Sequence, residues 1–85
     1  MGKRIVLGVL IRNRTTHAPE FQEIITQSGC NIKSRIGLHE VSDNACSPNG
    51  LILLEMYGDE APILDLESKL KTLEGFEVQK MVFQE

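Results

Sequence analysis

Two segments of this chain are apolar at almost every position, and they restrict its possible folds more than any other feature. Residues 4–11 read Arg-Ile-Val-Leu-Gly-Val-Leu-Ile, and residues 51–57 read Leu-Ile-Leu-Leu-Glu-Met-Tyr. A strand with one face in water alternates apolar and polar residues, whereas a strand covered on both faces does not. We therefore expect these two segments to be the central strands of a sheet.

A helical pattern follows each of these segments. After the first, Ala18, Phe21, Ile24 and Ile25 fall on one face, with Pro19 in the first turn and Gly29 as a left-handed stop. After the second, Asp59 is a plausible N-cap and Gly75 a stop. Between them the apolar positions Ile63, Leu66, Leu70 and Leu73 recur at helical spacing.

Two further segments are predicted to be strands. In residues 31–41, Ile32, Ile36 and Leu38 alternate with polar residues, which indicates a half-exposed edge strand. Residues 76–83 form the last strand, and residues 42–50 are turn-forming throughout.

The resulting order is strand, helix, strand, strand, helix, strand. It predicts an α+β, ferredoxin-like domain over residues 1–85, with the antiparallel strand order 4-1-3-2 and both helices on one face of the sheet. Two helices cover only one face, so the central strands leave apolar side chains on the other. A soluble monomer rarely exposes such a patch, and we expect a homodimer or homotetramer that buries it.

Charge and composition exclude several function classes. Nine basic and twelve acidic residues give a net charge of −3, so we expect no direct binding to nucleic acid. No apolar stretch approaches the roughly 18 residues that span a bilayer, and the basic N-terminus lacks a cleavage site. We expect a cytoplasmic protein that does not associate with membranes, with Cys30 and Cys46 as reduced thiols.

Signatures of catalysis and metal binding are missing. The chain has no GxSxG, phosphate loop, HExxH or CxxC, and we expect neither an enzyme nor a cofactor. His39 with Cys46, and His17 with Cys30, are the only pairs that suit zinc, nickel or copper. Since a metal site usually needs four ligands, we expect none of these residues to bind metal.

The candidate binding site lies where the first strand leads into the first helix. Arg12, Asn13 and Arg14 follow the strand's carboxyl end, where helix N–H groups and two guanidinium groups would receive a carboxylate or phosphate. Arg35 with Gly37 is the second candidate, because a glycine inside an edge strand often marks a close approach. The predicted ligand is small and anionic, or resembles an amino acid.

Several motifs resemble the iron-only hydrogenase system regulators across nearly the whole chain. They are the segment Ser34-Arg35-Ile36-Gly37-Leu38, with its Arg-x-Gly, and the run K-L-x-x-L-x-G-x-x-V from Lys69 to Val78. This resemblance implies an ACT-like fold, also similar to the C-terminal domain of the nickel-responsive repressor, together with homo-oligomers and a regulatory role. The break Arg12–Thr15 lacks the glycine of amino-acid-binding ACT domains, and residues 42–50 lack the repressor's histidine pair.

Three hypotheses of function follow. The first is a non-catalytic, homo-oligomeric ACT-like module that senses a small molecule. The second is a small enzyme or enzyme subunit of the dimeric-barrel type, and the third is a metal-responsive module. The sequence favours the first, because an enzyme normally shows a converging acid, base or nucleophile.

Overall fold

The structure, a computed structural model, describes residues 2–12, 18–41 and 46–85. It contains the six predicted elements in the predicted order, with one short 3-10 turn added. The elements are β1 (Lys3–Ile11), α1 (Ala18–Gln27), the 3-10 turn η1 (Gly29–Asn31), β2 (Ile32–Val41), β3 (Cys46–Met56), α2 (Glu60–Lys71) and β4 (Phe76–Gln84).

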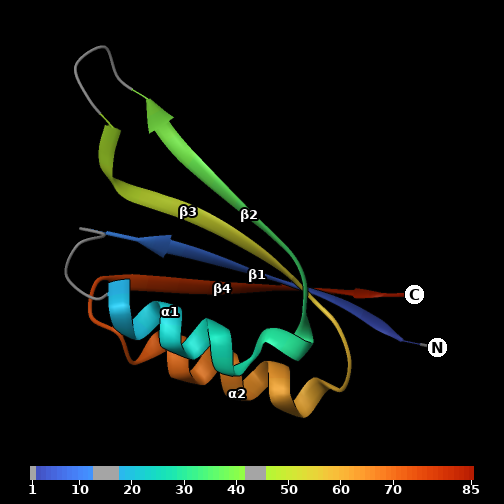
Figure 1. The fold of residues 1–85 in the computed structure, drawn as a ribbon. Helices are drawn as coiled ribbons and strands as arrows, with labels where there is room; N and C mark the ends of the chain where they lie inside the picture. The colour runs from blue at the N-terminus through green and yellow to red at the C-terminus, as the bar shows by residue number, and fades with distance from the viewer. Residues whose placement is uncertain (1, 13–17, 42–45) are drawn as a thin grey trace.

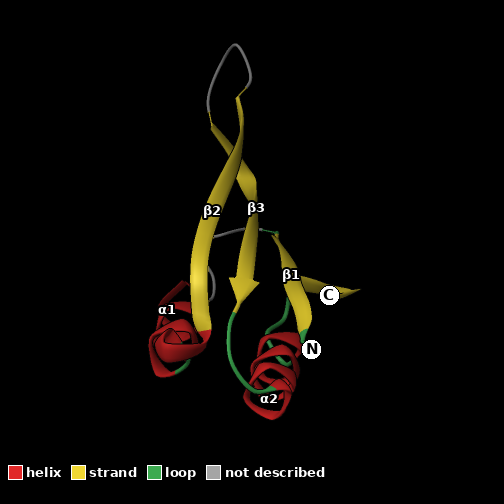
Figure 2. Ribbon diagram, turned by 90° about the vertical axis from the view of Figure 1, so that its right-hand side faces the viewer, coloured by secondary structure: helices red, strands yellow, loops and turns green. Residues whose placement is uncertain are grey.

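The four strands form one antiparallel sheet in the order β2-β3-β1-β4. This confirms the prediction that the two apolar segments are central and that β2 is an edge. Both helices lie on the same side of the sheet (Figure 1). Seen from the side, α1 lies beneath β2 and α2 beneath β1 (Figure 2). The fold is therefore ferredoxin-like, as predicted.

The hydrophobic core lies between the helices and one face of the sheet. Alternate residues of β1 are almost fully buried there, namely Ile5, Leu7, Val9 and Ile11. The helices contribute Phe21, Ile25, Ile63, Leu66 and Leu70 to the same cluster. The helical spacing found in the sequence thus marks the residues that α1 and α2 bury against the sheet.

The opposite face of the sheet carries no helix, and we call it the open face. Its apolar side chains are the alternate residues of the four strands, and several of them are large: Val6, Leu10, Ile36, Leu38, Leu51, Leu53, Met81 and Phe83. Ile36, Leu38, Met81 and Phe83 are each roughly half exposed. The predicted apolar surplus of the central strands is therefore present on this face.

The prediction of which β2 residues share one face of the sheet was wrong. Ile32, Ile36 and Leu38 were expected on the same side, but the pairing with β3 shifts between Ile32 and Ser34. Such a bulge adds one residue and exchanges the two faces beyond it. Ile32 consequently packs against the core, whereas Ile36 and Leu38 lie on the open face.

Two local predictions were also wrong. Residues 46–50, expected in a turn, belong to β3, because their backbone continues the pairing with β2 as far as Val41 with Cys46. Gly29 is not left-handed and opens η1 instead. Gly75 has the predicted left-handed backbone, with φ of 84°.

No helix in the described ranges is long and apolar enough to cross a membrane.

Candidate functional site

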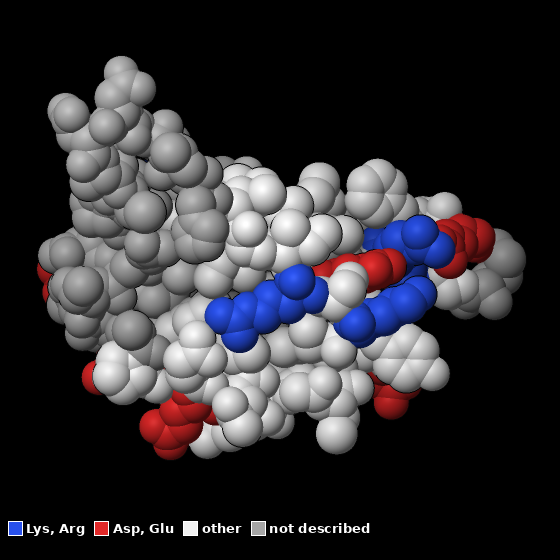
Figure 3. Space-filling view, turned by 45° about the horizontal axis from the view of Figure 1, so that its top comes forward, with Lys and Arg blue, Asp and Glu red and all other residues white. Residues whose placement is uncertain are grey.

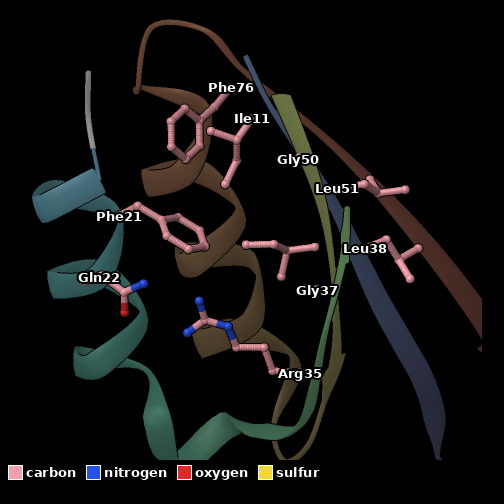
Figure 4. Close-up of a pocket in the computed structure, with 10 residues that line it drawn as sticks. Ile11, Phe21, Gln22, Arg35, Gly37, Leu38, Gly50, Leu51 and Phe76 are labelled. Atoms are coloured by element: carbon pink, nitrogen blue, oxygen red, sulfur yellow. The ribbon is translucent and has the colours of Figure 1, made fainter. Parts of the chain in front are cut away.

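A cavity of about 270 Å³ lies between α1 and the β2–β3 edge of the sheet. Its lining is largely apolar, with one basic side chain and one amide (Figure 4). The lining residues are Ile11, Phe21, Gln22, Arg35, Gly37, Leu38, Gly50, Leu51, Ile52 and Phe76. This volume is slightly below the roughly 300–1,000 Å³ typical of ligand pockets, so only a small ligand fits.

Two glycines make room for this cavity. Gly37 pairs with Ile52, and Gly50 pairs with Ile11, so both face the helix side of the sheet. A Cβ atom added to Gly37 would meet no atom within 4 Å. The side chains of Leu38 and Leu51 point away from the cavity (Figure 4). The space beside α1 is thus left open by missing side chains rather than by distorted backbone.

Arg35 is the cavity's cationic group. It pairs with the buried Leu54, which places it on the helix side of β2. Its guanidinium carbon lies 5.6 Å from the centre of the Phe21 ring, within the range of a cation–π contact. It forms no salt bridge with any carboxylate whose side chain the structure describes. Its charge is therefore available to a ligand.

The aromatic rings of Phe21 and Phe76 form the apolar side of the cavity. The ring centres of Phe21 and Phe76 are 5.5 Å apart, and the rings are tilted by 47°. Such a tilted pair adds stability beyond the area it buries. Gln22 projects from α1 towards Arg35 (Figure 4). The two polar side chains of the lining thus lie near each other, beside the two aromatic rings.

Arg12 lies on the other face of the sheet from Arg35. Its Nη2 donates to Glu77 Oε1 at 2.9 Å, and Glu77 lies on the open face because its neighbours Phe76 and Val78 pack into the core. This hydrogen bond, a second one from Gln79 and the charge of Arg12 lower the pKa of Glu77 below its usual 4.5. Arg12 and Arg35 are therefore not brought together.

Two of the predicted site residues, Asn13 and Arg14, lie outside the described residues, as does His17. Cys30 is exposed in η1, and His39 and Cys46 occupy backbone positions in β2 and β3. The described residues contain no group of three or more His, Cys, Asp or Glu that could hold a metal ion.

Sequence reasoning identified Arg35 and Gly37 but not their partners. Phe21 was assigned to the core, and it does belong there, but its side chain also lines the cavity. Gly50 was assigned to a turn. The alternation of a regular strand already put Arg35 and Gly37 on one side, and this was the signal for a shared site.

Basic and acidic side chains lie together on the surface. In Figure 3 the basic groups form a band with acidic groups, surrounded by uncharged atoms. Lys33 lies 3.9 Å from Glu55, and Arg4 lies 2.6 Å from Glu85. These pairs do not form the one-sided basic surface that contacts phosphates.

Solved structures share the fold of this chain. The uncharacterised protein TM1266 from Thermotoga maritima has a TM-score of 0.81 and 20% identity, covering 98% of this chain and 100% of that one. CPII from Thiomonas intermedia K12, a nitrogen regulatory PII-like protein bound to ADP, AMP and bicarbonate, has a TM-score of 0.58 and 10% identity, covering 99% and 96%.

The designed protein Foldit4 is also similar, with a TM-score of 0.53 and 14% identity over 99% of both chains. No family model matches the sequence, and no curated protein matches it. At these identities the likeness establishes the fold alone. Since one of these neighbours was designed de novo, function has to be argued from the site rather than from the fold.

Proposed function

We propose that this chain is a non-catalytic regulatory module that binds a small molecule and acts as a homo-oligomer. The observation that carries the proposal is the cavity between α1 and β2, which has an apolar wall and one cation without a described carboxylate partner. Among the described residues of the lining, none is a carboxylate, histidine, cysteine or hydroxyl that could act as a general acid, base or nucleophile. Such a lining suits binding without chemistry.

The position of the ligand within the cavity is inferred from the sequence motifs. Arg35 and Gly37, which line the cavity, belong to the segment that resembles the iron-only hydrogenase system regulators. We therefore place the ligand at Arg35 and Gly37. The binding role predicted for Arg12, Asn13 and Arg14 would belong to a separate site, because Arg12 is bonded to Glu77 on the face opposite the cavity.

Self-association is supported by the open face. Four of its large apolar side chains are each about half exposed, and monomers rarely keep such a patch in water. A second copy of the chain would cover it, and the ligand cavity lies on the other side of the sheet. Binding and association thus use different faces.

A thermal-shift screen with a blocked variant tests the binding function. The compounds are small carboxylates, nucleotides and bicarbonate, the last two because the similar CPII binds ADP, AMP and bicarbonate. A ligand at a hundred times its Kd should raise the Tm of a domain this small by roughly 10 °C or more.

The variant Gly37→Leu should abolish that rise, because its side chain would occupy the cavity. Gly37→Ala is the matched control, since its Cβ meets nothing within 4 Å and leaves most of the space open. No shift with any compound, or equal shifts in the wild type and in Gly37→Leu, would contradict the proposed function.

A further inference from the structure

The polar groups of the cavity define the kind of ligand that fits it. Arg35 supplies one positive charge, and Gln22 supplies an amide that can donate or accept. The remaining side chains that point into the cavity are apolar, with Phe21 and Phe76 as the largest. A matching ligand therefore has an apolar body and one polar end.

The guanidinium of Arg35 selects the geometry of that polar end. Its carbon lies 5.6 Å from the centre of the Phe21 ring, and the group forms no salt bridge with a carboxylate whose side chain the structure describes. A planar carboxylate is the acceptor that a guanidinium binds through two parallel hydrogen bonds. Resting on the proposed function, we propose that the cavity binds a small monocarboxylate with an apolar body and no amino group.

Phosphate is a poorer match for the same site. A phosphate carries nearly two charges and is usually held by several cations or by the N–H groups of a helix end. The described lining offers one guanidinium and one amide. Because the amide is neutral, the described lining balances one negative charge on the ligand, not two.

An amino acid is a poorer match as well. Its ammonium group would lie within a few bonds of the carboxylate and hence close to the guanidinium of Arg35. No described residue of the lining carries a negative charge that could compensate for this repulsion. The same carbon skeleton without the ammonium group avoids that conflict.

Three compounds with one skeleton separate these cases by calorimetry. They are 3-phenylpropanoate, its neutral amide 3-phenylpropanamide, and phenylalanine, which adds the ammonium group. We expect 3-phenylpropanoate to bind and the other two to bind at least about tenfold more weakly, since a hydrogen bond to a charged group is worth about that factor.

The variant Arg35→Gln should lower the affinity for 3-phenylpropanoate to that for the amide and leave the amide's affinity unchanged. Lys33→Gln is the matched control, because Lys33 lies two residues away on β2, is exposed and does not line the cavity. The ratio of acid to amide affinity is the readout, and a purely structural role of Arg35 would not change it. Folding of each variant is checked by its ¹H–¹⁵N spectrum.

Equal binding of acid and amide, or an acid preference that survives Arg35→Gln, would overturn this inference. So would phenylalanine binding as tightly as 3-phenylpropanoate. A compound of another class whose binding Gly37→Leu abolishes would also overturn it, while the proposed function would stand. If no compound binds in the cavity at all, both fail.

Discussion

Association through the open face can be tested by making one of its side chains polar. Ile36 is the most informative position, because it is 53% exposed and lies on the edge strand β2 among Leu38 and Leu53. The substitution Ile36→Ser removes an apolar side chain without touching the buried core. If a second copy of the chain covers this face, the change weakens the assembly rather than the fold.

The expected loss follows from the exposed fraction. Full burial of an isoleucine side chain stabilises by about 1.5–3 kcal/mol. Because about half of Ile36 is already covered in one chain, its further burial contributes about 1 kcal/mol per chain. A two-fold interface contains the residue twice, so Ile36→Ser should cost about 2 kcal/mol and raise the dimer's Kd roughly thirtyfold.

Sedimentation equilibrium over a range of protein concentrations measures this Kd directly. Leu64→Ser is the matched control, because Leu64 is also an exposed large side chain, at 37%, but lies on α2. Its substitution should leave the dimer's Kd unchanged. Thermal melting of both variants checks that neither one unfolds the chain.

Two results would refute this reasoning. The wild type could sediment as a 9.5 kDa species at all concentrations, which would mean that the open face is tolerated in water. Alternatively, Ile36→Ser and Leu64→Ser could change the Kd equally, which would place the interface elsewhere.

Two further predictions concern the junction between α2 and β4. Gly75→Ala should destabilise the fold by about 1–2 kcal/mol in urea, because Gly75 has φ of 84° and a Cβ atom would lie 3.2 Å from the carbonyl oxygen of Arg12. Gly29→Ala, which meets nothing within 4 Å, should stay within about 0.5 kcal/mol. The lowered pKa of Glu77 means that its ionised form stabilises the fold above its usual pKa of 4.5 and that this contribution disappears as the pH falls through the lowered value. Glu77→Gln should therefore lose less stability than the wild type as the pH falls from above 4.5 through the lowered pKa, and an equal loss would show that the bond to Arg12 has no effect in solution.

The arrangement of elements was predictable because it depends on local patterns. The continuous apolar runs of β1 and β3 are typical of central strands, which are covered on both faces. With these two strands in the centre, right-handed connections between the elements predict the observed order β2-β3-β1-β4. The apolar spacing from Ile63 to Leu70 likewise identified the buried side of α2. These features repeat over many residues, so a local irregularity does not obscure them.

The site was only partly predictable because it depends on contacts between distant residues. Arg12 bonds to Glu77, which lies 65 positions away, and nothing near Arg12 in the sequence indicates that partner. The cavity needs Phe21 from α1 and Gly50 from β3 to meet beside β2. A helix periodicity identifies Phe21 as buried but does not show that its side chain also lines a cavity.

The bulge in β2 decides which of the two proposed sites each residue beyond it belongs to. Without it, Ile32, Ile36 and Leu38 would share one face, and the strand would bury all three or none. The shift between Ile32 and Ser34 lets Ile32 remain in the core beside α1 while the residues beyond it change sides. Arg35 and Gly37 then line the cavity, and Ile36 and Leu38 add apolar surface to the open face. Alternation along the strand separates the two pairs, and the one extra residue decides which side of the sheet each pair takes, so that the proposed ligand cavity faces α1 and the proposed association surface lies opposite.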